Sequence, residues 1–442
     1  MRTFRGGVHP NSQKGATSAK PIVDLKPPEV LIYPLSQHIG APAVPCVKTG
    51  DTVRMGQKIA AADGFVSANI HASVSGKVKT IEKRLHPNGS CAESIVIEND
   101  GQDTPDPCLL QPERDYKKLS PKELIGLIQE AGIVGMGGAT FPTHVKLSPP
   151  DTAKIDHVII NGAECEPYLT SDHRAMLETP EDILTGLAVM LRIFGLTEGY
   201  IGIEDNKPDA IANMKAAAEH FKDAVIHVVS LRTKYPQGAE KQLISAITGR
   251  KVKPGQLPWQ VGCIVSNIDT SASIMRAVVR NQPLMQRIVT IGGDALKNPM
   301  NYRVRTGTPF SYILEQSGGF SQEPKKVLMG GPMMGMAVPN LDVPVIKGTS
   351  GILAFGERAA SLEQELPCVR CAKCLYVCPM NLQPNLLDKM SRADNFDALE
   401  KLHISDCIEC GSCAFVCPSK RRQVQQIKVA KVKMRNAQTK AK

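Results

Sequence analysis

Eight of the thirteen cysteines in this chain fall in two strings of one pattern, C-x2-C-x2-C-x3-C-P. In this pattern three closely spaced thiolates bind one [4Fe–4S] cluster, and the fourth, displaced cysteine binds the neighbouring cluster. The sequence therefore predicts two adjacent [4Fe–4S] clusters. We expect one to be bound by Cys368, Cys371, Cys374 and Cys417, and the other by Cys407, Cys410, Cys413 and Cys378.

Structural zinc is the alternative to iron–sulfur clusters. Zinc sites usually use two C-x2-C pairs separated by a longer loop and do not need a third cysteine at this spacing, so the clusters are favoured. Because two clusters that share ligands must be close, this segment is expected to transfer electrons. Apolar residues between the strings predict two short helices, with Asp394 or Asn395 as the N-cap of the second, and so a helical ferredoxin domain. These apolar residues are Leu386, Leu387, Met390, Phe396, Leu399 and Leu402.

The other five cysteines share no spacing, and buried thiols are the default expectation for them. They are Cys46, Cys91, Cys108, Cys165 and Cys263. Cys165 lies between Glu164 and Glu166, and these neighbours should raise the pKa of its thiol instead of activating it.

The net charge of +10 is concentrated at one end of the chain. From Lys420 onward there are nine basic residues and no acidic one, so the rest carries about +1 (10 − 9). The body gives no nucleic-acid signature, and we expect no nucleic-acid partner. The basic tail could contact an acidic protein, an anionic membrane surface or RNA, or be a solvated run of charge.

The apolar stretches are too short to span a bilayer, and the first residues lack the apolar core of a secretory signal. The cytosol is therefore the expected compartment. The cysteines of a cytosolic chain are more often ligands or nucleophiles than bridges.

A glycine-rich loop follows a helix-like stretch at residues 121–132. It contains Gly135, Gly137, Gly138, Phe141 and Lys146. It matches neither the Walker A pattern nor G-x-G-x-x-G, and a simple tight turn is the alternative. Glycines let backbone N–H groups approach a phosphate or a flat ring, and the lysine would supply a cation.

An apolar strand follows this loop and carries Asn161, Glu164, Glu166 and Asp172 at its carboxyl end. In an α/β sheet ligands bind at that end of the strands. The sequence therefore predicts a ligand site there.

These motifs, with Gly238-x-Glu240 and Asn267-x-Asp269-Thr270, resemble the FMN- and NADH-binding core of the 51 kDa-type flavoprotein subunit of respiratory complex I. With the opening FRGGVHP, the string GGPMMG at 330–335 and the two cluster motifs, residues 1–420 are most similar to the family of C subunits of Rnf electron-transport complexes. The resemblance implies a subunit that binds NAD(H) and non-covalent FMN. The implied contacts are Gly135, Gly137, Gly138, Phe141, Lys146, Asn161, Glu164, Glu166, Gly238, Glu240 and Asn267.

The resemblance also implies partners and a reaction. The subunit would exchange electrons between ferredoxin and NAD+/NADH, coupled to Na+ or H+ translocation by other subunits, including a ferredoxin-like iron–sulfur subunit. It would lie peripherally on the cytoplasmic side of a bacterial cell membrane, held by those partners. FMN itself would accept or give the hydride, so no catalytic protein acid or base is expected.

Two other functions stay open at this point. A cobalamin reductase of the related microcompartment type shares the flavin fold and clusters. A non-catalytic iron–sulfur docking subunit is the second, because Met136 and Ala239 replace an arginine and a glutamate of the complex I pattern.

The expected fold is multidomain α+β. After an N-terminal segment (1–25) we expect a biotinyl/lipoyl-like β barrel-sandwich (26–110), whose usual cofactor-lysine position falls near Phe65, so that a docking role is favoured. An α/β Rossmann-like FMN/NAD(H) domain (111–284), a β-grasp insert (285–350), a two-[4Fe–4S] helical ferredoxin domain (351–424) and a basic tail (425–442) would follow. The Met-rich string 329–336 should pack against a neighbouring domain.

Overall fold

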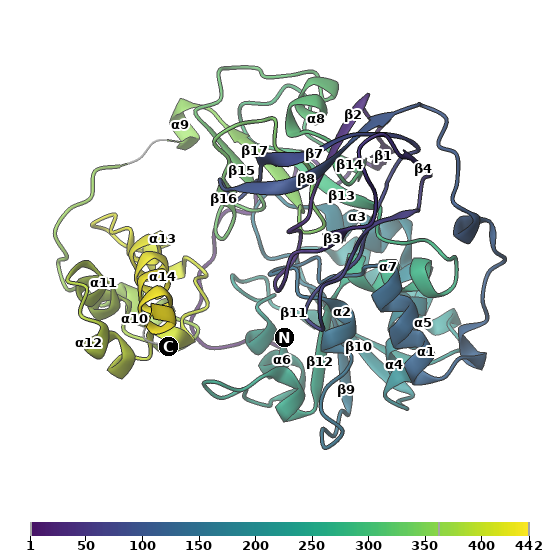
Figure 1. The fold of residues 1–442 in the computed structure, drawn as a ribbon. Coiled ribbons are helices and arrows are strands. Elements are labelled where there is room, and N and C mark those ends of the chain that lie inside the picture. Colours follow the sequence, from purple (N-terminus) through teal and green to yellow (C-terminus); the bar gives the residue numbers. More distant parts are fainter. Residues whose placement is uncertain (1, 361–362, 441–442) are drawn as a thin grey trace.

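The computed structural model describes residues 2–360 and 363–440 of the 442-residue chain. Three packed units form a large body, and a small helical unit lies beside it (Figure 1). We call the helical unit, residues 363–440, the cluster module. Among the described residues, no helix is both long and apolar enough to cross a membrane.

The first unit is a β barrel-sandwich of two antiparallel sheets, β2-β8-β7-β4 and β3-β5-β6. Alternate residues such as Leu31 and Tyr33 point inward and are fully buried, which is the pattern expected of half-buried strands. Its strands are β2 (Val30–Pro34), β3 (Val44–Pro45), β4 (Thr52–Val53), β5 (Lys58–Ala61), β6 (Ile70–His71), β7 (Gly76–Leu85) and β8 (Cys91–Asn99).

The second unit, here the α/β domain, is built on a parallel sheet in the order β11-β10-β9-β12. Along β9, Val158 and Ile160 pack against α1, α3, α4, α5 and α7, whereas Ile159 packs against α6 on the other face. Helices therefore cover both faces, and the strands read as continuous apolar runs. The elements are α1 (Pro121–Glu130), α2 (Thr143–Lys146), β9 (His157–Gly162), α3 (Ser171–Glu178), α4 (Pro180–Ile193), β10 (Glu198–Glu204), α5 (Pro208–His220), β11 (Val225–Leu231), α6 (Glu240–Thr248), β12 (Cys263–Asn267) and α7 (Ile268–Val278).

The third unit is a mixed six-stranded sheet in the order β1-β14-β13-β17-β15-β16, packed on α8. Its elements are β1 (Ile22–Asp24), β13 (Gln286–Gly292), β14 (Met300–Arg305), α8 (Phe310–Gln316), β15 (Lys326–Met329), β16 (Met336–Ala337) and β17 (Gly351–Phe355). Two strands correct the expected division of the chain. β1, from the N-terminal segment, lies parallel to β14 at the sheet edge, and β17 lies between β13 and β15 instead of opening the cluster segment at residue 351.

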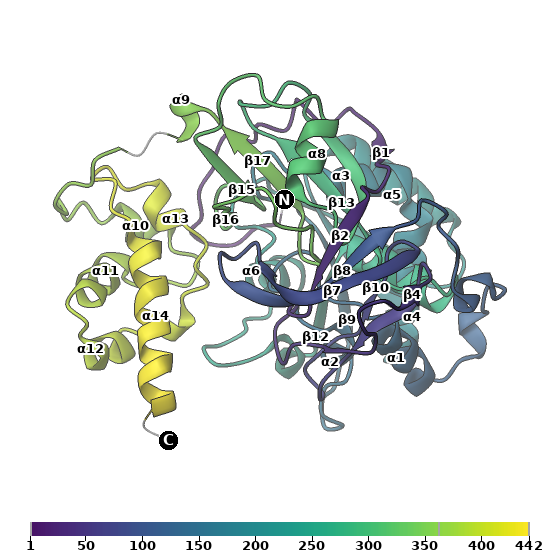
Figure 2. The same ribbon diagram turned by 45° about the horizontal axis from the view of Figure 1, so that its top comes forward.

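The cluster module consists of short helices and one long helix (Figure 2), which pack around a small apolar core. They are α10 (Lys373–Val377), α11 (Pro384–Arg392), α12 (Phe396–Lys401), α13 (Ser412–Phe415) and α14 (Gln423–Lys440), and α9 (Glu357–Ala360) precedes the module. The two helices expected between the cysteine strings are confirmed as α11 and α12. Asn395 is the N-cap of α12, since its Oδ1 accepts a hydrogen bond of 3.0 Å from the Ala398 N–H.

The last helix differs from the expected separate basic tail. α14 runs through residue 425 without a break, and Ile427 and Ala430 are buried against Leu387 and Leu399 of α11 and α12. The inward residues Ile427, Ala430 and Met434 recur at helical spacing, so one face of this basic segment is part of the core.

Candidate functional site

The carboxyl ends of β9 and β12 bring two of the predicted residues together. Asn161 and Asn267 are direct partners in the parallel register. Asn161 Nδ2 donates to the Gly238 carbonyl at 2.8 Å, which fixes the loop before α6. Asn267 is the N-cap of α7 and accepts from the Asp269 N–H at 2.9 Å, while its Nδ2 donates to Asp172 Oδ2 at 2.7 Å. Both amides therefore have fixed orientations at the edge where α/β sheets bind ligands.

The glycine loop lies directly against this edge. It is closed at its base by a 2.8 Å hydrogen bond from the Gly135 N–H to the Phe141 carbonyl. A Cβ atom on Gly137 would lie 3.0 Å from Asn267 Nδ2, whereas one on Gly138 would meet nothing within 4 Å. The backbone thus passes close to Asn267 at Gly137, whereas the space beside Gly138 is open. This cradle fits a flat ring or a phosphate.

Lys146, at the end of α2, supplies the predicted cation. Its Nζ lies 3.0 Å from Glu240 Oε1, at the start of α6, and 3.0 Å from the Val265 carbonyl of β12. The structure therefore brings Lys146, Glu240, Gly137, Asn161 and Asn267 to one sheet edge.

A second cation reaches the glycine loop from a residue that the sequence did not single out. Arg287 of β13 forms an ion pair with Asp269 and contacts the Met136 sulfur, and its Nη2 donates to the Met136 carbonyl at 3.4 Å. The loop position occupied by methionine, where the complex I pattern has arginine, is thus next to a buried guanidinium. No local pattern could place Arg287 there, because it comes from a different domain.

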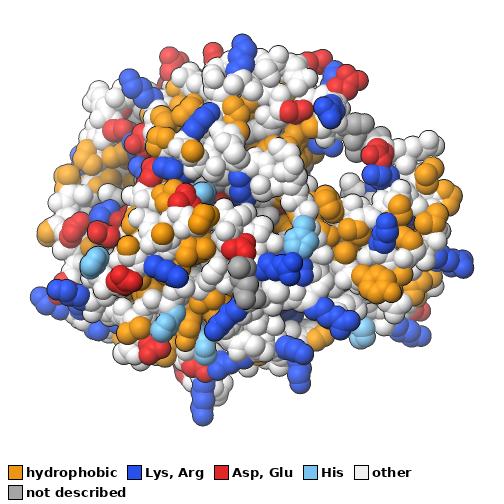
Figure 3. Space-filling view, turned by 180° about the vertical axis from the view of Figure 1, so that it is seen from behind, with side chains coloured by type: hydrophobic (Ala, Val, Ile, Leu, Met, Phe, Trp, Pro, Cys, Tyr) orange, Lys and Arg blue, Asp and Glu red, His pale blue; other side chains and the backbone are white. Residues whose placement is uncertain are grey.

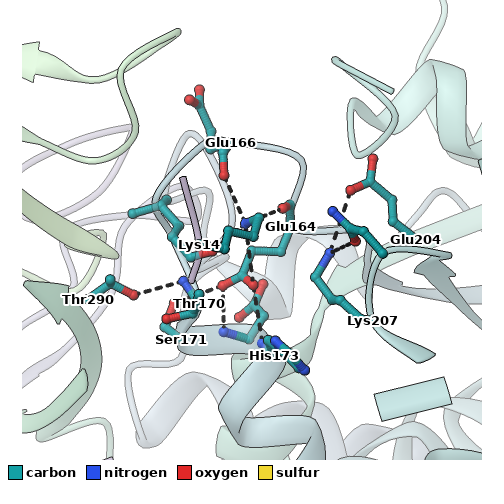
Figure 4. Close-up of polar contacts among 12 residues, drawn as sticks. Lys14, Glu164, Glu166, Thr170, Ser171, His173, Glu204, Lys207 and Thr290 are labelled. Atoms are coloured by element: carbon teal, nitrogen blue, oxygen red, sulfur yellow. Dashed lines mark hydrogen bonds and ion pairs between the residues drawn. The ribbon is translucent and has the colours of Figure 1, made fainter. Parts of the chain in front are cut away.

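Glu164 points toward the start of α3 (Figure 4). Its Oε1 accepts from the Asp172 N–H at 2.8 Å and its Oε2 from the His173 N–H at 3.3 Å. A carboxylate at a helix N-terminus is stabilised by the free N–H groups and the helix dipole. Glu164 therefore fixes the β9–α3 connection.

Two buried lysines hold the same connection, and neither was predicted from the sequence (Figure 4). Lys14 Nζ donates to the Glu164 and Glu166 carbonyls, each at 2.9 Å. Lys207 Nζ donates to the Ala163 carbonyl at 2.6 Å and lies 3.5 Å from Glu204 Oε2. Burial lowers the pKa of Lys14. The lysines satisfy carbonyl groups that would otherwise be unpaired in the interior.

Glu166 connects the α/β domain to the Met-rich string. Its two oxygens accept from the Met333 N–H at 3.0 Å and the Met334 N–H at 2.9 Å. Burial raises the pKa of Glu166 to about 7. Met333 in turn packs with Val8 and Tyr235, so the expectation that this string packs against a neighbouring domain is confirmed.

Asp172 is hydrogen-bonded to Asn267 at this edge. Its side chain is partly buried, and desolvation together with the charges of Glu164 and Asp269 raises its pKa. Its 2.7 Å hydrogen bond from Asn267 opposes this shift.

The cysteines of the two strings gather in two groups. One small pocket is lined by Cys368, Cys371, Cys374 and Cys417, so it combines three cysteines of the first string with the last of the second. In the other group, burial and then the thiols of Cys410, Cys407 and Cys378 raise the pKa of Cys413. A donor set of four thiols from both strings fits the chemistry of an iron–sulfur cluster.

The thiols of each group do not converge on one point. In the described ranges, no three His, Cys, Asp or Glu side chains are arranged to hold a single metal ion. A cubane binds each thiolate through a different iron, so its ligands surround a volume.

The remaining cysteines only partly follow expectation. Cys263 is buried, but Cys46, Cys91 and Cys108 are exposed, so the default of a buried thiol was wrong for these three. Cys165 Sγ accepts a 3.4 Å hydrogen bond from the Gly238 N–H, and burial, followed by the charge of Glu204, raises its pKa.

The barrel-sandwich also touches the glycine loop. His144 of α2 is buried, its Nε2 lies 3.0 Å from the Phe65 carbonyl, and the two rings meet edge to face. The position that would carry a lysine in a lipoyl domain is therefore a packing contact. A cavity of about 340 Å³ lies elsewhere between the units, and no residue of the glycine loop lines it.

Models of four domain families match the chain. They are the Nuo51 FMN-binding domain (residues 128–276), the RnfC barrel sandwich hybrid domain (2–102), the SLBB domain (288–337) and the 4Fe-4S dicluster domain (367–421). The fold is similar to a chain of a solved NAD+-reducing [NiFe]-hydrogenase, with a TM-score of 0.52 at 17% identity over 73% of this chain and 65% of that one.

Curated relatives match along almost the whole length. The chain is 50% identical to the C subunit of the proton-translocating ferredoxin:NAD(+) oxidoreductase complex of Clostridium ljungdahlii, over 99% of this chain and 95% of the relative. It is 48% identical to the C subunit of the Na(+)-translocating ferredoxin:NAD(+) oxidoreductase complex of Acetobacterium woodii, over 97% and 96%. The chain therefore belongs to the C-subunit family of ion-translocating ferredoxin:NAD(+) oxidoreductase, or Rnf, complexes.

Proposed function

We propose that this chain is the NAD(H)-binding, FMN- and iron–sulfur-containing subunit of an Rnf-type complex, an NAD-dependent oxidoreductase that exchanges electrons between ferredoxin and NAD+/NADH. The observation that carries the proposal is the pairing, in one chain, of the glycine-loop edge with a pocket lined by four thiols from both strings. Relatives named as C subunits of ferredoxin:NAD(+) oxidoreductase complexes match at 50% and 48% identity.

The chain's own residues would bind and orient the cofactors. Gly135, Gly137 and Gly138, with the amides of Asn161 and Asn267, would hold non-covalent FMN, and Lys146 would bind its phosphate. FMN supplies the conversion between the two-electron hydride of NADH and single electrons. The protein needs no acid or base for that conversion, so its task is placement.

The NAD(H) contacts are the more open part of the site. Glu240 lies at the same edge as Lys146 and suits hydrogen bonding to ribose or nicotinamide, and Gly238, whose carbonyl is bound by Asn161, would shape the loop beside it. Phe141, Glu164 and Glu166 belong to the same predicted set. In the structure the two glutamates bind backbone N–H groups, which favours a role in shaping this edge.

We propose two [4Fe–4S] clusters with crossed ligands. Cys368, Cys371, Cys374 and Cys417 would hold the first, and Cys407, Cys410, Cys413 and Cys378 the second. We call these the outer and the inner cluster. The shared pocket of Cys417 with the first string supports the crossed assignment.

The partners and location follow from the relatives. They are named as subunits of proton- or Na(+)-translocating complexes, so we propose that other subunits, including a ferredoxin-like iron–sulfur subunit, move the ion. The chain would lie peripherally on the cytoplasmic side of the membrane, attached through those subunits.

Finer features of the fold support the same proposal. The parallel sheet with helices on both faces is consistent with a Rossmann-like domain, and the mixed sheet packed on α8 with a β-grasp insert. Because β1 and β17 belong to the mixed sheet, we propose units at 26–110, 111–284, 285–355 with β1, and 363–440.

Anaerobic reconstitution tests the proposal. The purified chain would be loaded with iron, sulfide and FMN and titrated with NADH while visible and EPR spectra are recorded. Bleaching of the flavin followed by reduced-cluster signals is the expected result. Clusters that reduce with dithionite but not with NADH, in a chain that retains no flavin, would show a docking subunit instead.

A further inference from the structure

The α/β domain and the N-terminal segment meet the cluster module at a narrow joint. Among the described residues, the hydrogen bonds that cross this joint end on Val377, Pro379, Met380 and Cys410. The acceptors are thus Cys410 itself or residues within two positions of Cys378. Both cysteines belong to the proposed inner cluster.

Tyr235 lies at the centre of the joint. Its side chain is 1% exposed, and its hydroxyl donates a 2.7 Å hydrogen bond to the Cys410 carbonyl. Its backbone exchanges two hydrogen bonds, of 2.8 and 2.9 Å, with Val8 of the N-terminal segment. That segment then reaches the module, where the Gly7 N–H donates to the Val377 carbonyl at 2.8 Å. Tyr235 is therefore held at its backbone by the N-terminal segment and at its hydroxyl by the cluster module.

Close packing leaves no room at this joint. A Cβ atom on Gly6, which has a φ of +85°, would lie 3.0 Å from the Cys378 carbonyl oxygen. Val8, Tyr235 and Cys410 form one apolar cluster, with Cys165 and Met333 packed against it. A tightly packed contact keeps the distance between the two parts fixed.

The proposed ligands of the outer cluster do not face the joint. Cys368 and Cys371 are exposed, and Val369 between them is 67% exposed. Seen from behind, hydrophobic side chains gather on the cluster module, with basic ones among them (Figure 3). The two groups thus differ in what they face: one faces the α/β domain and the other faces solvent.

We propose that Tyr235 is the positioning residue for electron transfer between the flavin edge and the inner cluster, acting through its hydrogen bond to the Cys410 carbonyl. The inference rests on the proposed function and adds a named residue to it. The inner cluster then exchanges electrons with the flavin, and the outer cluster exchanges them with a redox partner.

The chain connects Tyr235 directly to the candidate flavin edge. Gly238 follows it by three residues, and its carbonyl accepts the 2.8 Å hydrogen bond from Asn161. The N–H of Gly238 donates to Cys165, which packs in the same cluster as Tyr235. The loop from Tyr235 to Gly238 therefore contacts both Asn161, at the candidate flavin edge, and Cys410, a proposed ligand of the inner cluster.

The electron balance of the step is simple. With both cofactors bound, the oxidation of FMNH2 would release two electrons, one at a time, and two protons to water. The inner cluster, held by Cys378, Cys407, Cys410 and Cys413, would take each electron singly and pass it to the outer cluster. In the opposite direction, two electrons and two protons from water would restore FMNH2, and hydride transfer to NAD+ would release one proton.

Tyr235→Phe in the full-length reconstituted chain is the central test. The ring is kept and the O–H donor is lost, so added negative charge on the inner cluster is less stabilised. We expect the midpoint potential of the inner cluster, measured by EPR-monitored dithionite titration, to become more negative while that of the outer cluster is unchanged. Flavin-to-cluster transfer in stopped-flow mixing with NADH should slow about two- to tenfold, as expected for one lost hydrogen bond.

Two matched controls separate this effect from loss of structure. Tyr376→Phe removes the hydroxyl of a tyrosine on the same module that is 80% exposed, and should change neither value. Gln242→Ala removes the 3.2 Å hydrogen bond to the Pro379 carbonyl at the same joint and should leave the inner potential in place. An equal shift in Gln242→Ala would show that Tyr235 acts only by holding the joint, and would overturn the proposal.

A second substitution keeps the test decisive if Tyr235→Phe loads less iron. Tyr235→3,5-difluorotyrosine preserves the hydroxyl and makes it a stronger donor, so the inner potential should shift in the opposite direction, to a less negative value. No shift in either variant would reject the proposal. The dithionite titration needs no NADH, so it tests the role of Tyr235 separately from the proposed function. The proposed function would instead be rejected if NADH failed to bleach the flavin of the wild-type chain.

Discussion

Lys146 Nζ lies 3.0 Å from Glu240 Oε1, so the cation beside the glycine loop has a carboxylate partner before any anionic ligand is bound. An arriving phosphate would compete with Glu240 for the ammonium group. Lys146→Met should therefore weaken FMN binding about 10- to 100-fold, the range expected for a lost charged hydrogen bond. Glu240→Gln removes the competitor and should leave FMN binding equal or tighter, while raising KM for NADH.

Quenching of FMN fluorescence on binding gives the affinity of each variant for FMN. The two variants are matched, because each removes one charge of the same ion pair. Equal weakening of FMN binding by both would show that the ion pair only stabilises the fold.

The proposed crossed ligand sets predict that single cysteine substitutions damage one cluster selectively. Cys378→Ala should impair the cluster held by Cys407, Cys410 and Cys413, and Cys417→Ala the cluster held by Cys368, Cys371 and Cys374. Iron content and the EPR spectrum of the dithionite-reduced chain would show which signal is lost. Damage by Cys378→Ala to the other cluster alone would contradict the assignment.

The raised pKa of Glu166 predicts that the stability of the folded chain depends on pH. Its pKa is raised from 4.5 to about 7 because it is buried. Between these values the folded chain binds a proton that the unfolded chain has released, so stability should fall as pH rises from about 4.5 to 7 and change little above. Glu166→Gln should flatten this slope in thermal unfolding scans. Because glutamine has one acceptor for the two N–H groups, the slope, and not the absolute midpoint, is the test.

The role of α14 can be tested with neighbouring residues of one helix. Ile427 is 1% exposed, and Ile427→Ala should destabilise the cluster module by about 2–4 kcal/mol through the cavity it leaves. Val429 is exposed, and Val429→Ala should change stability by less than about 0.5 kcal/mol. Loss of cluster absorbance during urea unfolding of the full chain measures both. Equal effects would mean that the helix does not pack as described.

Local features of the structure were predictable from the sequence. The α11–α12 pair followed from apolar spacing, and Asn395 from its capping chemistry. The carboxyl-edge position of Asn161 followed from an apolar run that ends in polar residues. These features depend on residues close together in the chain.

Features that depend on distant residues were not predictable. Arg287 reaches the glycine loop from the mixed sheet, and Lys14 reaches the β9–α3 connection across about 150 residues. The central position of β17 depends on pairing with β13, which a local apolar pattern does not specify. The inward face of α14 was obscured by its high charge, although the spacing of Ile427 and Ala430 was visible.

The hydrogen bond from Gly7 to Val377 also constrains how the chain is assembled during synthesis. Val377 is translated 370 residues after Gly7, which takes on the order of tens of seconds at ribosomal speed. Val8 can pair with Tyr235 only after the α/β domain has emerged. Gly7 can bond to Val377 later still, when the cluster module has emerged. The segment around Gly7 thus completes these contacts only after both the α/β domain and the cluster module have been synthesised, and its docking reports that both are in place.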